Sequence, residues 1–268
     1  MKNLLWYCAI VFLAACGFQK DNQLHKAPLQ PTDFFEEFSD AADRLIQLSP
    51  NGLAIGEVHG QREGVEFMKA AVKSAVDRGL TVLLLLEISP SEAGLDVSSL
   101  DLGDYRAIDM SDKTLPFWTQ NLDMRASWEL YDYLVQVSGR PNIEVSYFMD
   151  SRLNPGPNRL KAHGLAERWN IAKQARPEHY VISWSGNYHT SVNQQYPLDV
   201  TNSMCRYLLE TYDYAPTCMS VDSFASTGKN CADNVKAKLI EGPQVHEPWD
   251  YVVWHPDRCT RKSHWVGH

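Results

Sequence analysis

Residues 81 to 88 read Thr81-Val82-Leu83-Leu84-Leu85-Leu86-Glu87-Ile88 and carry a single charge, on Glu87. A strand that is apolar on both sides is typical of a parallel sheet whose two faces are covered by helices. Along the rest of the chain, similar apolar runs alternate with segments of helical spacing. This alternation predicts an α/β fold with a doubly wound, mostly parallel sheet flanked by helices.

The expected elements follow from apolar periodicity and from turn residues. Helices are predicted over 33–48, 63–78, about 125–137, 160–174 and 203–211, and strands over 53–58, 81–88, 143–149, 180–184 and 251–254. The segment 104–120, rich in aromatic and acidic residues, departs from this rhythm. We expect it to form a helical lid over the strand ends.

Two short runs close apolar stretches with the same pattern, Gly-x-x-His. They are Gly56-Glu57-Val58-His59 and Gly186-Asn187-Tyr188-His189. Parallel sheets present their ligands at the carboxyl ends of the strands, and Glu87 ends a third strand. The sequence therefore predicts that His59, Glu87 and His189 converge at one edge of the sheet. His59 alone could simply cap the next helix, but the repeated placement favours a site.

Two imidazoles and a carboxylate permit two kinds of catalysis. They can hold a divalent metal ion that leaves positions open for water, with His59, Glu87 and His189 as ligands. Without a metal, the same groups can act as general base and acid. Glu57 is a fourth catalytic candidate, which could orient His59 or act as a base itself. Ser185 lacks the glycine pattern of a nucleophile elbow, so a serine hydrolase is not expected.

Other residues are candidates for substrate binding. Arg125 could clamp an anionic group, or form a surface ion pair with a neighbouring acid. Asn187 and Tyr188 lie within the second motif, although an aromatic residue there can equally belong to the core. Asp150 follows the strand 143–149 and so lies at the same edge, where it could also cap a helix.

The first residues predict export. Lys2 precedes an apolar run over 4–12 that is too short to span a membrane comfortably, as in a secretory signal. The run Leu13-Ala14-Ala15-Cys16-Gly17 matches the bacterial lipobox, so we expect a lipidated Cys16 at the mature N-terminus. An ordinary cleavage site with an incidental cysteine is the alternative.

This interpretation divides the chain into three parts. Residues 1–16 would be the lipoprotein signal and the lipidated cysteine, 17–31 a polar tether, and 32–268 a single domain attached to the membrane by its lipid. Lipoprotein sorting rules, applied to Gly17, favour the outer membrane of a bacterial cell envelope, with the domain facing the periplasm.

Cysteine usage agrees with export. Four cysteines fall in the last quarter of the chain: Cys205, Cys218, Cys231 and Cys259. Zinc binding is the competing interpretation, but no Cys-x-x-Cys pair is present, so two disulfides are favoured. The sequence allows three pairings. We expect Cys205 to pair with Cys218, joining a helix to the next strand, and Cys231 to pair with Cys259, so that the C-terminal segment is pinned.

The charge balance excludes one class of partner. The chain has 25 basic and 33 acidic residues and a formal net charge of −8. Binding to nucleic acid requires clustered lysines and arginines, which are missing here. The charge does not by itself name a substrate; as partners we expect a small-molecule or peptide substrate and the membrane that holds the lipid anchor.

The two Gly-x-x-His motifs and the acidic strand end resemble those of the erythromycin esterase/ChaN-like/Tiki superfamily, over about residues 50–255. His59, Glu87 and His189 match motif residues, Glu57 matches the acidic residue of the first motif, and Arg125 lies in a segment that resembles the esterase region after the second strand. The four-cysteine C-terminal segment departs from the family pattern.

The resemblance implies an α/β core with one of three activities. Erythromycin esterases use a histidine to activate water, Tiki-type proteases are thought to depend on a divalent metal, and ChaN-like lipoproteins bind haem. We expect a lipid-anchored extracytoplasmic hydrolase. The alternative is a haem- or iron-binding lipoprotein without catalysis, with Tyr105, Tyr188 or a C-terminal histidine as the donor to iron. A structural lipoprotein without chemistry is a third possibility.

Overall fold

The structure is a computed structural model of the chain and describes residues 33–34, 38–57, 62–120, 128–153, 158–190, 203–214, 216–223, 238–241 and 251–255. Several predicted features lie outside these residues: the signal segment, the lipobox and the tether, and also His59, Arg125, Cys231 and Cys259. Among the helices that are described, none combines the length and the apolar character needed to cross a membrane.

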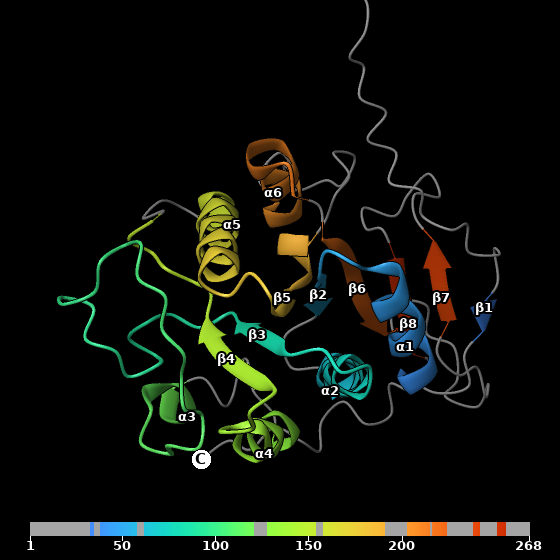
Figure 1. Ribbon diagram of the computed structural model, residues 1–268, viewed down its shortest axis with the longest axis horizontal. Helices are drawn as coiled ribbons and strands as arrows, with labels where there is room; N and C mark the ends of the chain where they lie inside the picture. Colours follow the sequence, from blue (N-terminus) through green and yellow to red (C-terminus); the bar gives the residue numbers. More distant parts are fainter. Residues whose placement is uncertain are drawn as a thin grey trace, which may run out of the picture.

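The strands are β1 (Asp33–Phe34), β2 (Leu53–Glu57), β3 (Val82–Leu86), β4 (Ile143–Tyr147), β5 (Tyr180–Gly186), β6 (Thr217–Ser223), β7 (Lys238–Glu241) and β8 (Tyr251–His255). The helices are α1 (Phe38–Leu48), α2 (Arg62–Asp77), α3 (Pro116–Gln120), α4 (Trp128–Val137), α5 (Asn158–Ala175) and α6 (Met204–Tyr212), with a 3-10 turn η1 at Asn187–Thr190. Figure 1 shows how these elements surround the sheet.

In the part of the chain that is described, the strands form one sheet in the order β1-β7-β8-β6-β2-β5-β3-β4. The strands from β8 to β4 in this order pair in parallel, while β7 and β1 add antiparallel pairs at the other edge. The chain moves from β2 to β4 through α2 and α4, then returns to β5 and β6 through α5 and α6. The fold is therefore the doubly wound α/β sheet that the sequence predicts.

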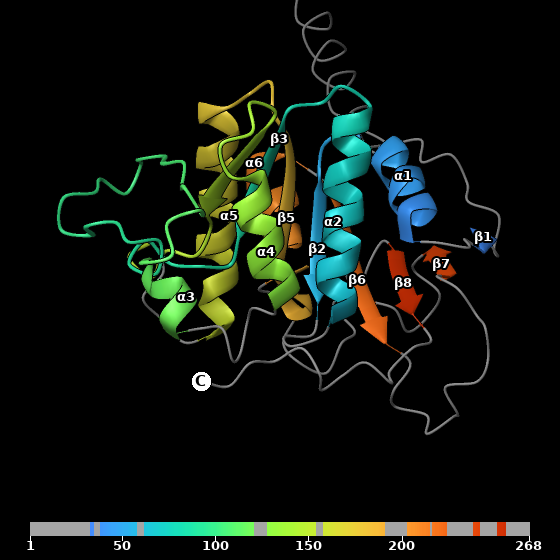
Figure 2. The same cartoon turned by 90° about the horizontal axis from the view of Figure 1, so that it is seen from below.

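Side-chain alternation along the strands separates two apolar cores. On β3, Val82, Leu84 and Leu86 face the core that contains α1, α2 and α4, whereas Leu83 and Leu85 face the core that contains α5 and α6. Figure 2 shows α1, α2 and α4 together on one face of the sheet. A strand buried on both faces needs apolar residues at every position, which explains the uninterrupted run of leucines.

The insertion between β3 and β4 departs from the strand–helix rhythm, as predicted. Residues 89–115 form turns, and α3 follows them. Part of the insertion runs along the outer edge of β4, where Ala107 forms an antiparallel bridge with Ser146 and the Ile108 N–H donates to the Val145 carbonyl at 2.8 Å. This pairing covers an edge strand that would otherwise present unpaired backbone groups.

The disulfide between Cys205 and Cys218 is present and joins α6 to β6, with Cα atoms 6.4 Å apart. The sequence prediction of this bridge is confirmed, and with it the pinning of this part of the C-terminal segment. The second predicted bridge, Cys231 with Cys259, lies outside the described residues.

One helix prediction is wrong at its start. Asp33 and Phe34, expected within a helix, form β1 and pair with Lys238 and Leu239 of β7. Helical apolar spacing over a few residues is a weak local preference, and pairing with a distant strand overrides it. β7 at Lys238–Glu241 was not among the predicted strands, and β6 at Thr217–Ser223 was expected only as the strand that Cys218 would join to a helix.

Candidate functional site

The structure brings together part of the predicted site. Glu57, Glu87 and His189 belong to the carboxyl ends of β2, β3 and β5, which lie side by side in the order β2-β5-β3. Asn187 lies in the turn η1 with His189. For Tyr188 only the backbone is described, while His59 and Arg125 lie outside the described residues. Whether the two histidines meet therefore stays a prediction.

Glu87 lies where the hydrogen-bond ladder between β3 and β5 ends. Leu86 is in register with Trp184, and the Glu87 N–H donates to the Trp184 carbonyl at 3.1 Å. In a parallel ladder, the next bond would run from the Gly186 N–H to the Glu87 carbonyl. Here the Gly186 N–H donates to Glu87 Oε2 at 2.7 Å instead. The side chain thus takes the place of a backbone acceptor, which fixes the carboxylate at the edge of the sheet.

The second oxygen of this carboxylate faces the histidine of the second motif. His189 Nε2 lies 3.5 Å from Glu87 Oε1. Glu87 is only 4% exposed, whereas the His189 side chain keeps 17% of its surface. A buried carboxylate needs hydrogen-bond donors; the Gly186 N–H supplies one, and His189 Nε2 lies where it can supply a second. The imidazole is held by an acid on one side and remains accessible on the other.

The second motif packs directly on the first. A Cβ atom on Gly56 would lie 2.2 Å from Thr190 Oγ1 and 2.7 Å from Asn187 Cα, so only glycine allows η1 to approach β2 this closely. The Thr190 hydroxyl also donates to the Met219 carbonyl of β6 at 3.0 Å. Glycine at position 56 and threonine at position 190 together set the position of the turn that carries His189.

Glu57 is also buried but faces the opposite side of the sheet. It follows Leu53 and Ile55 in the alternation that points toward the core of α2. A Cβ atom on Gly64, in the first turn of α2, would lie 2.6 Å from Glu57 Cβ. A carboxylate beside the first turn of a helix interacts favourably with the helix dipole. Glu57 and the Glu87–His189 pair are thus separated by the sheet.

The spacing of the Glu87–His189 pair also fits a metal site. Two atoms that each lie about 2.1 Å from a tetrahedrally coordinated ion are about 3.4 Å apart, close to the observed 3.5 Å between Nε2 and Oε1. Within the described residues, however, no three side chains of the His, Cys, Asp and Glu types come close enough to hold an ion. A third ligand would have to come from outside these residues, where His59 lies.

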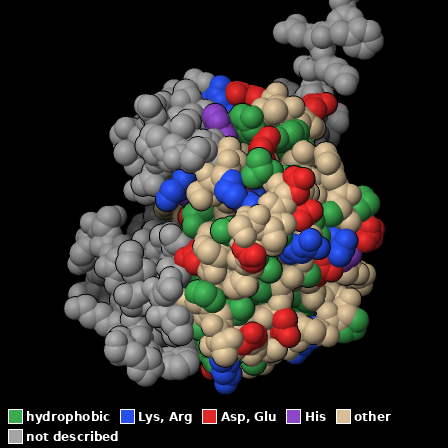
Figure 3. All heavy atoms as spheres, turned by 90° about the vertical axis from the view of Figure 1, so that its left-hand side faces the viewer, with side chains coloured by type: hydrophobic (Ala, Val, Ile, Leu, Met, Phe, Trp, Pro, Cys, Tyr) green, Lys and Arg blue, Asp and Glu red, His purple; other side chains and the backbone are tan. Residues whose placement is uncertain are grey.

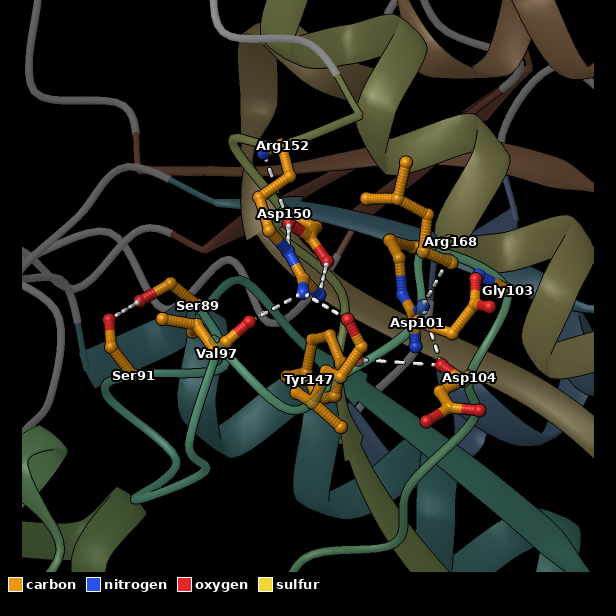
Figure 4. Close-up of polar contacts among 12 residues, drawn as sticks. Ser89, Ser91, Val97, Asp101, Gly103, Asp104, Tyr147, Asp150, Arg152 and Arg168 are labelled. Atoms are coloured by element: carbon orange, nitrogen blue, oxygen red, sulfur yellow. Dashed lines mark hydrogen bonds and ion pairs between the residues drawn. The ribbon is translucent and has the colours of Figure 1, made fainter.

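Asp150 lies at the same edge of the sheet, as predicted, but it is committed to an ion pair. Its carboxylate accepts from Arg152 Nε at 3.0 Å and from Nη2 at 2.7 Å (Figure 4). Burial raises the pKa of Asp150, but the hydrogen bonds and the charge of Arg152 outweigh burial and hold this pKa below its ordinary value. Asp150 therefore stays ionised and holds Arg152 in place.

Gly56 was identified from the sequence only as part of the first motif, whereas the structure shows that it admits η1. Two further residues that shape this site were not predicted. Thr190 and Gly64 carry no sequence signal of their own, because Thr190 acts through Gly56 and Met219, which are far away in the chain, and Gly64 through the close approach of α2 to Glu57. The glycine of the first motif was nevertheless noticed, and its spacing from the histidine pointed to the correct edge of the sheet.

Comparison with known proteins supplies few relatives. No family model matches the chain, and no curated protein matches it. Among solved structures, the type III effector HopBA1 is similar with a TM-score of 0.49 and 14% identity, over 88% of this chain and 100% of that one. A protein from Bacillus cereus is similar with a TM-score of 0.44 and 11% identity, over 83% of this chain and 94% of that one.

Proposed function

We propose that this protein is a lipid-anchored extracytoplasmic hydrolase that cleaves an ester or amide bond in a small molecule or peptide. The observation that supports this most is the pair formed by His189 and Glu87, with 3.5 Å between Nε2 and Oε1 at the carboxyl edge of a parallel sheet. A partly exposed histidine oriented by a buried carboxylate is the arrangement that general-base catalysis requires.

The pair assigns a role to each nitrogen of the imidazole. Nε2 faces Glu87 and carries the proton, so Nδ1 is the base. Nδ1 takes a proton from water while the water oxygen bonds to the carbonyl carbon of the substrate. The same proton then passes to the departing oxygen or nitrogen as its bond to carbon breaks. Glu87 stabilises the imidazolium that exists between these two transfers.

A divalent ion is compatible with the same residues. Glu87 and His189 have the separation of two ligands, and His59 is the expected third. Such an ion would lower the pKa of a bound water and so supply hydroxide near neutral pH. In that case the Gly186 N–H, which donates to the other oxygen of Glu87 at 2.7 Å, would hold the carboxylate in its ligating orientation.

The lipobox at residues 13–17 supports the proposed location in the cell envelope. The disulfide between Cys205 and Cys218 agrees with an oxidising compartment. Replacing Cys16 by serine is expected to move the protein from the membrane fraction to the soluble fraction. Continued attachment to membranes would refute the lipid anchor.

The experiment that tests the proposed function compares two histidines on the full-length protein in detergent. His189→Gln should lower hydrolysis of a panel of aryl esters and fluorogenic peptides by about 100-fold or more. The matched control is His179→Gln, because His179 also pairs with a glutamate, Nδ1 lying 2.9 Å from Glu178 Oε1, but at the amino end of β5. That variant should keep the activity of the wild type.

Equal activity of His189→Gln and wild type would overturn the proposal, provided that thermal unfolding shows both to be folded. Elemental analysis of the same preparations separates the two mechanisms. A stoichiometric divalent metal that is lost in His189→Gln supports the metal-dependent form, and activity without metal supports the general-base form. Saturable binding of haemin without any hydrolysis would favour the haem-binding alternative.

A further inference from the structure

Two arginines hold part of the insertion between β3 and β4 against the core. We call residues 97–104 the strap. Arg152, in the turn after β4, donates from Nη1 to the carbonyls of Val97 at 3.0 Å and Leu100 at 2.9 Å. Arg168 of α5 donates from Nη1 to the carbonyls of Leu102 at 3.4 Å and Asp104 at 2.7 Å. Figure 4 shows the guanidinium groups of Arg152 and Arg168 at different parts of the strap, near Val97 and near Asp104.

Arg152 uses all of its nitrogens. Besides the two carbonyls on Nη1, its Nε and Nη2 donate to the two oxygens of Asp150 at 3.0 and 2.7 Å. These two nitrogens form one edge of the planar guanidinium, the edge that matches a carboxylate in a bidentate pair. Contact with the strap therefore occupies one end of Arg152, and a carboxylate occupies the other edge.

Arg168 also donates from Nη1 to the strap, but no carboxylate of the described residues pairs with its Nε and Nη2. Its side chain is 0% exposed, and its Nε and Nη2 find no hydrogen-bond acceptor among the residues that the structure describes. The ring of Tyr147 lies 4.2 Å from the guanidinium carbon and favours the positive charge, but a ring face does not replace two hydrogen bonds. Within the described part of the chain, the bidentate edge of this fully buried arginine is thus left without an acceptor.

The neighbouring carboxylates are already engaged. Both oxygens of Asp150 accept from Arg152. Asp104 Oδ2 pairs with Arg106 at 3.1 Å, and Asp101 Oδ1 accepts from the Gly103 N–H at 3.1 Å. Burial lowers the pKa of Arg168, yet a guanidinium keeps its proton in proteins. A buried charge with unmet donors is costly, which calls for an anion as the compensating group.

We propose that the Nε–Nη2 edge of Arg168 binds an oxyanion, the carboxylate or phosphate group of a ligand, in the geometry that Arg152 shows with Asp150. The strap, whose carbonyls accept from Nη1 of the same guanidinium, lies beside this edge, and the ligand displaces the strap as it enters. The proposal stands independently of the hydrolase, since it rests only on the two arginines and the groups around them.

The strap suits the role of a displaceable cover. Its Val97 and Leu102 are exposed large hydrophobic side chains, so it buries little apolar surface, and the bonds described above attach it through its backbone carbonyls. Segments with few buried apolar contacts open at low cost. On the face where the insertion lies, acidic, basic and hydrophobic side chains of the described residues intermingle (Figure 3), and this coloured part of the face shows no basic patch.

The position of this edge also suits ligand binding. The Met149 N–H donates to the Ile88 carbonyl at 3.0 Å, which ties the segment after β4 to the segment after β3. Asp150 and Arg152 follow on one of these segments, and Glu87 precedes the contact on the other. The arginine pair therefore lies on the side of the sheet where ligands of doubly wound folds bind.

The test measures the unfolding temperature of the full-length protein in detergent at constant ionic strength, with chloride replaced stepwise by inorganic phosphate or by acetate. A saturable rise of about 3 °C is expected in the wild type once the anion exceeds its Kd about tenfold. Arg168→Lys keeps the charge but loses the bidentate edge, and it should lose this rise. The matched control Arg152→Lys should keep the rise, even if its starting temperature is lower.

The two probes also identify the ligand class. A response to phosphate alone assigns a phosphate-bearing ligand, and a response to acetate alone assigns a carboxylate. The absence of a rise with both anions overturns the proposal. An equal rise in wild type and Arg168→Lys also overturns it, because salts excluded from protein surfaces stabilise any fold.

Hydrogen exchange on the wild type keeps the proposal testable if Arg168→Lys does not fold. Amides of peptides covering 97–104 should exchange faster in phosphate or acetate than in chloride, because the ligand displaces the strap. Unchanged exchange in the strap, with the same rates elsewhere in the chain, would contradict a ligand at Arg168.

Discussion

The two ends of β5 each carry a histidine beside a glutamate. At the amino end, His179 pairs with Glu178, its neighbour in sequence, whose side chain is 66% exposed. At the carboxyl end, His189 pairs with Glu87 from another strand, and this carboxylate also accepts the Gly186 N–H. The amino-end pair joins adjacent residues and its carboxylate is exposed, whereas two segments far apart in sequence, the end of β3 and the turn after β5, converge to build the carboxyl-end pair.

This difference shows that a contact between histidine and glutamate is not by itself a sign of catalysis. A pair whose carboxylate is exposed gains little, because water screens the charge of that carboxylate. A buried carboxylate keeps its orientation and its charge only if the surrounding backbone supplies donors, as Gly186 does for Glu87. At the carboxyl end of β5 the backbone therefore fixes the carboxylate of Glu87, whereas the carboxylate of Glu178 at the amino end is exposed.

The largest expected effect comes from removing the charge of each glutamate. Glu87→Gln should lower hydrolysis by about 100-fold or more, because His189 loses the group that orients it and stabilises its protonated form. Glu178→Gln should leave hydrolysis unchanged. Steady-state rates on the substrate panel check both. An equal loss of hydrolysis in the two variants would show that the pair at the carboxyl end of β5 has no special role in catalysis.

Glycines beside the same two ends of β5 give a second contrast. A Cβ on Gly56 would lie 2.2 Å from Thr190 Oγ1, and a Cβ on Gly52, which has φ +111°, would lie 2.8 Å from the Val181 carbonyl. Each alanine variant should lower stability by about 1–3 kcal/mol through crowding or backbone strain. Gly56→Ala should also lose activity, since η1 and His189 must move, whereas folded Gly52→Ala should remain active.

Denaturant unfolding and steady-state rates on both alanine variants measure this contrast. If Gly56→Ala kept full activity, the position of η1 would not matter for the reaction. If Gly52→Ala lost activity while folded, the two ends of the strand would be coupled, and the comparison would no longer separate stability from function.

Local residue patterns were enough to predict most of the sheet. The leucines at 83–86 are apolar on both faces because both faces are covered, and a pattern of this kind is visible without the structure. The bridge between Cys205 and Cys218 was predicted because its cysteines lie in consecutive elements. β1 was missed because its two residues are held by a partner strand about 200 residues away.

Only the part of the site that lies at strand ends was predicted from the sequence. The motif spacing placed Glu87 and His189 at one edge, and the structure pairs them. The alternation along β2 indicates that Glu57 points away from its neighbours on the strand, but only the contact with Gly64 shows that the side it faces is the one covered by α2. Arg168 was not predicted, because an arginine in a helix is ordinarily exposed, and only the fold buries it.

The disulfide should affect stability more than catalysis. It closes a loop with a sequence separation of 13 residues, and its removal is expected to cost about 3 kcal/mol. The double variant Cys205→Ser, Cys218→Ser should therefore unfold at lower denaturant concentration. Its turnover under native conditions should stay close to that of the wild type, because Cys218 pairs in register with Ala54, in the interior of β2. A large loss of turnover would show that the bridge positions η1.

The smallest expected effect is on how the free energy of unfolding changes at acidic pH. The pKa of Asp150 is lowered in the folded protein, so its ionised form stabilises the fold. This contribution to stability is complete above the ordinary aspartate pKa of about 3.9. It is lost as the pH falls through the lowered pKa of the folded state. Asp150→Asn should cost about 1–2 kcal/mol at pH 7, because the buried partner of Arg152 is removed. The difference from wild type should shrink as the pH drops below about 4.

The pKa of Glu178 is also lowered, first by a backbone hydrogen bond and then by the charges of His179 and Arg176. The contribution of Glu178 to stability is likewise favourable at neutral pH and lost as the pH falls. The Glu178 carboxylate is exposed, however, so water screens its charge. Glu178→Gln should therefore follow the wild-type stability curve at every pH. Urea unfolding of the three proteins between pH 3 and 7 would reveal whether burial sets the strength of a carboxylate pair, because equal losses for Asp150→Asn and Glu178→Gln would show that it does not.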